Sequence, residues 1–216
     1  MTVAKRPWPP APAAPAGRPA AVIRLSFLES DADIVAAIRA GDGAGGAALY
    51  DRHHGYVRRV LLRVLGPDAE LHDLIQDVFV AAIDSIERLA EPNALRAWLA
   101  AISVHCAHAE LRRRTRGRWL SLLPWSELPP VEAPIAPPEL DEAVRATYHV
   151  LTKLTPDERI PFALRFIEGM ELVELASACG VSLATAKRRL ARARKKFVTI
   201  AQTYPSLSDW LAGGEL

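Results

Sequence analysis

Apolar residues recur every three or four positions through most of the chain between residues 30 and 200. This spacing places them along one side of a helix, so the segments are predicted to be amphipathic helices. Segments that alternate apolar and polar residues, as strands do, are scarce, and Ala, Leu, Arg and Glu are abundant. The pattern predicts an all-α fold with helices over residues 30–39, 44–65, 69–89, 93–114, 139–154, 155–169, 171–178 and 182–197.

Two of these helices carry clear start signals. Ser30 and Asp33 have the spacing of a capping box, in which two side chains bond the free amides of the first turn. Thr155 and Glu158 repeat this arrangement, with proline at the first helical position between them. Pro161 lies inside the same helix and is predicted to kink it, because proline removes one backbone hydrogen bond.

Proline-rich segments divide the chain into two small helical domains. Residues 1–25 are rich in Pro and Ala and predict a disordered tail. Residues 117–138 contain six prolines and predict a semi-stiff Pro-rich linker. The domains are therefore expected at 26–116 and 139–203, with a C-terminal tail over 204–216. Because the linker is long, few contacts are expected between the domains in the free protein.

The segment 182–197 combines an apolar side with a basic side. Ser182 is a favourable N-cap. The residues predicted to be buried recur at helical spacing and are Leu183, Ala186, Leu190, Ala193 and Phe197. Every charged residue of the segment is basic, namely Lys187, Arg188, Arg189, Arg192, Arg194, Lys195 and Lys196. A helix with one buried side and one cationic side suits the major groove of DNA.

The residues before this segment strengthen that interpretation. Residues 171–178 predict a short helix and residues 179–181 a tight turn, with Gly180 where the chain must turn sharply. This is the spacing of a helix-turn-helix. The alternative is a solvated basic helix in an ordinary helical bundle.

Charge is segregated along the chain, although the formal net charge is only +2. Acids dominate residues 67–92, and basic blocks at 112–118 and 187–196 balance them. This distribution predicts an acidic face for one partner and basic faces for a polyanion.

Cys106 and Cys179 are far apart in sequence, so a disulfide framework is not expected and the reducing cytoplasm is the expected compartment. No apolar run approaches the roughly 20 residues that span a bilayer, and the N-terminus lacks the apolar core of a secretory signal.

Three motifs occur in order along the chain. Residues 73–79 read DLIQDVF, residues 95–99 read LRAWL, and residues 154–194 read LTPDERIPFALRFIEGMELVELASACGVSLATAKRRLARAR. In this order and spacing, the chain resembles a bacterial RNA polymerase sigma factor of the extracytoplasmic-function (ECF) type, in the sigma-70 family. The resemblance covers about residues 30–115 and 139–200. ECF sigma factors keep only sigma domains 2 and 4, which would correspond to the two predicted helical domains.

The resemblance implies a function in transcription. Such a protein binds core RNA polymerase and directs promoter-specific initiation, by reading the −35 element and by recognising and melting the −10 element. It is not an enzyme and uses no cofactor. Its partners would be core polymerase and promoter DNA, and an anti-sigma factor is a candidate partner.

The predicted third helix carries a polar stripe formed by Asp73, Gln76, Asp77 and Asp84. These residues fall at positions i, i+3, i+4 and i+11, so they share one face. The family uses the matching stripe to bind the clamp helices of the largest polymerase subunit. A solvated acidic face without a partner is the alternative.

The predicted fourth helix matches the part of the family that binds the −10 element. The residues assigned to it are Trp98, His105, Arg112, Arg113, Arg114 and Arg116. The arginines suit phosphate contacts, and Trp98 suits either core packing or base stacking. The chain departs from the family at His105, at Ala109, and at Leu89 and Leu95, where aromatic residues are frequent. These departures bear on the −10 preference and on melting.

The basic helix matches the part of the family that reads the −35 element in the major groove. The residues assigned to it are Ser182, Ala184, Thr185, Lys187, Arg188, Arg189, Arg192 and Lys195. Arg188 points away from the apolar stripe and suits a bidentate contact to guanine. The other cations suit phosphates, and solvation without a contact is the alternative for each.

Three rival interpretations remain on the sequence. His105 and His108 lie one turn apart beside Cys106, and other histidines occur at 53, 54 and 72, but the set lacks an established metal-ligand spacing, so no metal site is expected. A DNA-binding response regulator shares the helix-turn-helix but requires alternating strands, which residues 30–115 do not show. A sigma-like DNA-binding regulator without initiation activity is the third.

Overall fold

The computed structural model describes residues 28–68, 70–117 and 138–212. The predicted N-terminal tail and nearly all of the predicted linker lie outside these residues. Within them the chain forms helices and no strand, as the sequence predicts. Four helices make up the N-terminal part: α1 (Asp31–Arg39), α2 (Gly43–Leu65), α3 (Leu71–Asp84) and α4 (Leu95–Gly117).

The C-terminal part contains the predicted helices and, after them, two short additions. These are α5 (Pro138–Leu151), α6 (Pro156–Phe162), the π-helical turn η4 (Ala163–Ile167), α7 (Leu172–Ala178) and α8 (Leu183–Ala201), followed by η5 (Pro205–Leu207) and α9 (Ser208–Ala212). Pro161 lies inside α6, and the helix continues directly into the π-helical turn η4, in which the Glu168 amide donates to Ala163 O at 3.0 Å. Leu207 is buried against α5, so the described part of the C-terminal tail is docked.

The third helix is shorter than predicted. It ends at Asp84, and the chain continues through η1 (Ile86–Arg88) and η2 (Pro92–Ala94) before α4 begins. Because the helix ends at Asp84, the side chains of Ile86 and Leu89 can both pack into the core. The Arg39 guanidinium of α1 donates to the backbone carbonyls of these two residues. Backbone groups that a longer helix would have bonded internally are thus satisfied by a side chain.

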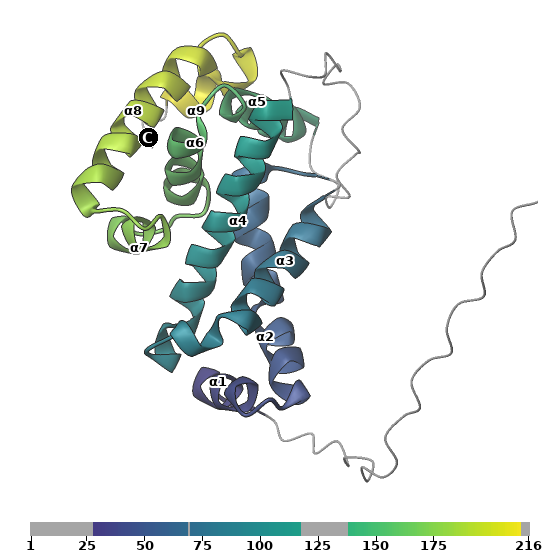
Figure 1. Cartoon of the computed structure of the whole chain (residues 1–216). Coiled ribbons are helices and arrows are strands. Elements are labelled where there is room, and N and C mark those ends of the chain that lie inside the picture. The colour runs from purple at the N-terminus through teal and green to yellow at the C-terminus, as the bar shows by residue number, and fades with distance from the viewer. Residues whose placement is uncertain (1–27, 69, 118–137, 213–216) are drawn as a thin grey trace, which may run out of the picture.

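The long helix α4 lies at the centre of the molecule (Figure 1). It contacts α2 and α3 on one side and α6 and α7 on the other. The interior side of the N-terminal part consists mainly of aliphatic side chains that are almost completely buried, among them Leu49, Val57, Leu61, Leu95 and Leu99. The departures at Leu89 and Leu95 are therefore core positions in this chain.

The prediction of few contacts between the two parts is wrong for this structure. One apolar core runs from α2 and α4 into α6 and α7, and its C-terminal members include Ile160, Leu164 and Leu175. A second, smaller core joins α5, α6 and α8 around Phe162 and Phe197. The linker composition contains no information about this contact, because the surfaces that meet belong to helices about 100 residues apart in sequence.

Candidate nucleic-acid and protein interfaces

The helix α8 is fixed along one side and exposed along the other. Ala186, Ala193 and Phe197 are completely buried. The Phe197 ring stacks on Phe162 with 4.3 Å between centroids and an interplanar angle of 21°. Ser182 caps the helix, because its hydroxyl accepts from the Thr185 amide at 3.2 Å. The buried side therefore sets the rotation of α8, and that rotation decides which cations face outward.

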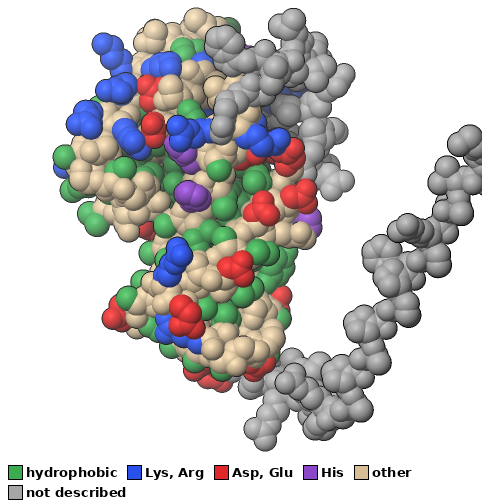
Figure 2. Space-filling model, viewed as in Figure 1, with side chains coloured by type: hydrophobic (Ala, Val, Ile, Leu, Met, Phe, Trp, Pro, Cys, Tyr) green, Lys and Arg blue, Asp and Glu red, His purple; other side chains and the backbone are tan. Residues whose placement is uncertain are grey.

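The cations of α8 lie mainly on the outer face. Five of them are exposed, namely Lys187, Arg188, Arg192, Arg194 and Lys195, and Ala184 is exposed among them. Figure 2 shows Lys and Arg side chains gathered over the part of the surface that α8 forms. This is the one-sided cationic surface that the sequence predicts.

Three positions of α8 differ from the sequence prediction, and one of them, Leu190, is only partly buried although it was expected in the buried stripe. Leu183 was expected in the buried stripe but is 40% exposed, because the first turn of α8 extends beyond the core. Arg189, expected on the outer face, is half-buried and forms an ion pair with Asp157 of α6 at 3.0 Å. Gly180 adopts a φ of +62° in the turn before α8, a conformation that glycine adopts without strain.

The arginines near the end of α4 are engaged with acids. Arg113 bonds Glu110 and Glu70, and Arg114 bonds Glu110 and Asp68. The Glu110 side chain is only 6% exposed. Burial opposes its ionisation, but hydrogen bonds from both arginines outweigh burial and hold its pKa below the ordinary value. Two cations predicted to meet phosphates are therefore neutralised within this structure.

The remaining residues assigned to the −10 element lie along the same helix. His105 is exposed, and Arg112 is exposed at the edge of a cleft. Trp98 is half-buried and packs against the core, as one of its two predicted roles requires. Arg116 belongs to α4, but its side chain lies outside the described part of the chain.

The polar stripe of α3 is solvent-exposed over its whole length. Asp73, Gln76, Asp77 and Asp84 are all exposed, opposite the buried Ile75, Val78, Phe79 and Ala82. Figure 2 shows acidic side chains where α3 reaches the surface. Val80 is 58% exposed and Ile83 39% exposed beside this stripe. Sequence reasoning missed these two residues, although Val80 lies at i+3 from Asp77 and Ile83 at i+7 from Gln76, and both spacings place them on the side of the polar stripe.

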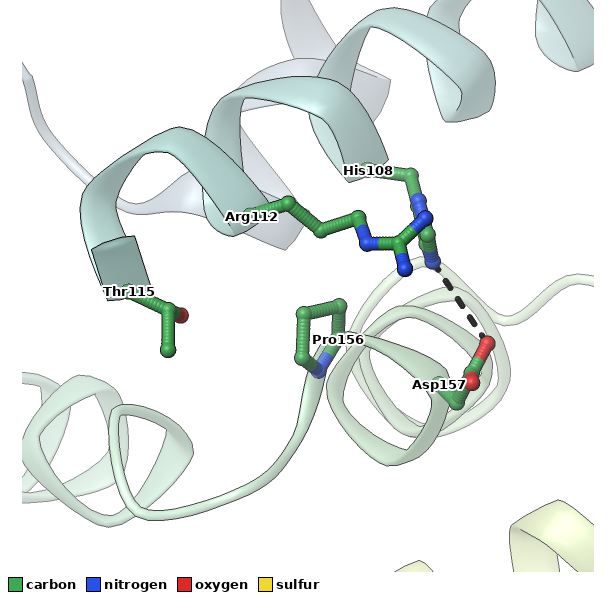
Figure 3. A pocket seen from close by; sticks show the side chains of 5 residues that line it. All are labelled: His108, Arg112, Thr115, Pro156 and Asp157. Carbon is green, nitrogen blue, oxygen red and sulfur yellow. Dashed lines mark ion pairs between the residues drawn. The ribbon is translucent and has the colours of Figure 1, made fainter.

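A cleft of about 790 Å³ separates the end of α4 from the start of α6. Figure 3 shows His108 and Arg112 of α4 directed toward Asp157, and the His108 ring lies 3.5 Å from the Asp157 carboxylate. Cys179 lines the adjoining hollow, and burial raises the pKa of its thiol to about 11. Among the described residues, no group of three His, Cys, Asp or Glu side chains is placed to hold a metal ion.

Comparison with known proteins assigns each of the two parts of the chain to a protein family. Residues 49–117 match the family model for sigma-70 region 2, and residues 145–197 match the model for sigma-70 region 4. The chain belongs to the sigma-70 family as an ECF sigma factor. Accordingly it binds RNA polymerase and promoter DNA, directs transcription initiation, and is not an enzyme. The response-regulator interpretation is wrong, because region 2 occupies the place of a receiver domain.

Individual relatives agree with this assignment. The ECF sigma factor SigX of Bacillus subtilis is 29% identical over 135 residues, which are 60% of this chain and 70% of SigX. SigM of Mycobacterium tuberculosis H37Rv is 27% identical over 171 residues, 79% of this chain and 84% of SigM. The solved structure of CnrH in complex with the cytosolic domain of CnrY has the same fold, with a TM-score of 0.56 and 23% identity, and the match covers 81% of this chain and 98% of CnrH. No helix in the described ranges is long and apolar enough to cross a membrane.

Proposed function

We propose that this ECF sigma factor reads the −35 element with the outer face of α8. The observation that carries the proposal is the rotation of the helix: its buried side stacks on α6, so Arg188, Arg192 and Lys195 face outward together. Arg188 lies in the half of the helix that meets base edges in helix-turn-helix proteins. Lys187, Arg192 and Lys195 hold phosphates, while Ala184 allows close approach to the groove and Thr185 contributes a methyl or hydroxyl contact.

We assign the binding of the −10 element to α4. His105 and Arg112 are exposed on the side of α4 that faces the cleft, and they are the first candidates for contact with the melted strand. Arg113 and Arg114 contribute less to phosphate binding than the sequence suggests, because acids already neutralise them. Trp98 supports α4 from the core side.

We assign the binding of core RNA polymerase to the exposed side of α3. Asp73, Gln76 and Asp77 form an exposed acidic and polar row, and Val80 and Ile83 add an exposed apolar strip beside it. A strip of this kind gives apolar area at the centre of an interface while the charges select the partner. The protein acts in the cytoplasm, where polymerase is found, with sigma domain 2 over 26–116, sigma domain 4 over 139–203 and the linker between them.

A selection experiment tests the promoter assignment. Core polymerase loaded with this chain is mixed with random-sequence DNA duplexes, and bound duplexes are amplified and sequenced. Two conserved elements at a fixed spacing are expected, and Arg188→Ala should remove the preference at one base pair of the upstream element. Enrichment of no element, or an upstream element that keeps its preference at every base pair in the Arg188→Ala variant, contradicts the assignment.

An anti-sigma factor is a further proposed partner. CnrH is recorded in complex with the cytosolic domain of CnrY, and it shares this fold. A protein segment that binds α3 or the outer face of α8 would compete directly with polymerase or DNA.

A further inference from the structure

A buried carboxylate on α4 holds the two arginines that follow it in the sequence. The Glu110 side chain is only 6% exposed, and none of the contacts proposed for α4 involves it. Its Oε2 accepts from Arg113 Nε at 2.7 Å, and its Oε1 accepts from Arg113 Nη2 at 2.9 Å and from Arg114 Nε. Two parallel bonds between one guanidinium and one carboxylate are the strong, geometrically specific form of this contact. Glu110 is therefore placed to hold cations and not to meet water.

Two acids at the start of α3 complete the network. Glu70, which directly precedes α3, bonds Nη2 of Arg113, and Asp68 bonds Nη1 of Arg114. Three carboxylates and two guanidiniums give the network a formal charge of −1. The end of α4 therefore carries less positive charge toward a polyanion than its run of arginines indicates.

The two arginines of the network differ in what lies within their reach. Arg114 is 29% exposed and its Nη2 is buried, so it lies on the inner side of the network. Arg113 is 61% exposed and its partner Glu70 is 50% exposed, so this end of the network meets water. Successive residues of a helix are about 100° apart, which places Arg113 next to Arg112 at the edge of the cleft. Arg113 is therefore the member of the network that can reach DNA once Glu110 releases it.

We propose that Glu110 limits the affinity of sigma domain 2 for DNA of arbitrary sequence, because it withholds Arg113 from the phosphates. This role rests on the proposed function of α4, since only a helix that meets DNA has phosphates for Arg113 to bind. Phosphate contacts supply nearly all of non-specific binding and carry no sequence information. An arginine held by an internal acid adds little to that binding, so base contacts decide a larger share of the affinity. Glu110 is thus a specificity-determining residue that acts through Arg113 without touching DNA.

Salt titration of DNA binding by the full-length chain, without polymerase and on a duplex of arbitrary sequence, tests this role. Glu110→Gln keeps the shape of the side chain and removes the charge that holds Arg113. The variant is expected to bind the duplex at least about threefold more tightly, and its salt slope should steepen by about 0.9, the value of one phosphate contact. Asp51→Asn is the matched control, because it removes one negative charge from an exposed position on α2 and should leave the slope unchanged. Equal slopes for Glu110→Gln and Asp51→Asn overturn the role of Glu110.

A double-mutant cycle shows whether Arg113 is the released cation. Arg113→Ala should hardly change the slope of the parent chain, where Glu110 neutralises it, but should remove the whole gain when it is combined with Glu110→Gln. An equal loss in both backgrounds overturns the inference.

Single variants decide if Glu110→Gln does not fold. Arg112→Ala should then lower the slope of the parent chain by about 0.9, and Arg113→Ala by much less. A loss in Arg113→Ala as large as that in Arg112→Ala overturns the role of Glu110. No loss in either variant contradicts the proposed function of α4, and with it the role of Glu110.

Discussion

Replacing Arg114 with alanine tests whether this side chain stabilises the fold through its ion pairs or contacts DNA. Arg114 lies between Asp68 and Glu110, whose side chains are 14% and 6% exposed, and its own side chain is 29% exposed. An exposed ion pair stabilises by about 0–1 kcal/mol, whereas removing one partner of a buried pair costs about 3–5 kcal/mol. Arg113 still bonds Glu110 in the variant. We therefore expect the free energy of unfolding to fall by about 2 kcal/mol.

Two measurements on the full-length chain test this expectation. Urea unfolding followed by circular dichroism gives the stability, and the m-value should be unchanged if the native state keeps its extent of burial. Promoter binding by the holoenzyme at several salt concentrations gives the number of phosphates neutralised, because each contact contributes about 0.9 to the salt slope. Arg192→Ala is the comparison, since Arg192 is exposed on α8. It should lower the slope by about one and leave stability unchanged.

The opposite pattern refutes the reasoning. If Arg114→Ala keeps its stability and lowers the salt slope by about one, Arg114 leaves its acids to meet a phosphate. The network at the end of α4 would then be a feature of the free chain only.

Four further predictions concern the other surfaces and the core. The double variant Asp73→Ala/Asp77→Ala should weaken binding to core polymerase at least about tenfold and change the unfolding free energy by less than about 0.5 kcal/mol; unchanged capture of polymerase contradicts the role of α3. Arg188→Ala should cost about 1–3 kcal/mol on the selected promoter and flatten preference at one base pair, whereas an equal loss on all single-base variants would make Arg188 a phosphate contact. Phe197→Ala should lower the unfolding free energy by about 3–5 kcal/mol, because a stacked and fully buried ring is lost; a loss below about 1 kcal/mol is incompatible with this packing. Glu158→Ala should lower it by about 1–2 kcal/mol at pH 7. Burial opposes ionisation of Glu158, but bonds from Thr155 and Lys196 outweigh burial and hold its pKa below the ordinary value of a glutamate. Its contribution is therefore present above the ordinary glutamate pKa of about 4.3 and is lost as the pH falls through the lower folded-state pKa, so the gap between parent and variant should close in acid.

Local sequence signals predicted the helices because each signal acts within one or two turns. The capping boxes at Ser30 and Thr155 form as expected. The rotation of α8 was correct for most positions, since Ala186, Ala193 and Phe197 are completely buried. The exposure of the α3 stripe followed in the same way from helical spacing.

Features that depend on pairing between distant segments were not predictable. The bonds from Arg159 to the end of α2 join residues about 95 positions apart. A single sequence contains no signal for such a pairing, because any arginine and any helix end satisfy the local rules equally. The same applies to Arg114 with Asp68 and to Arg189 with Asp157. Charge alone therefore overstated how many arginines are left without an acidic partner in the described residues at the predicted DNA surfaces, since Arg114 and Arg189 pair with acids.

Promoter-dependent transcription by purified components is the most direct test of the central claim. Core RNA polymerase is combined with the full-length chain and a linear template carrying the selected promoter, and run-off transcripts are measured. The account predicts a transcript of defined length that requires both the chain and the promoter and that is lost with Asp73→Ala/Asp77→Ala. Binding to polymerase and DNA without any transcript would contradict it and leave a DNA-binding regulator without initiation activity.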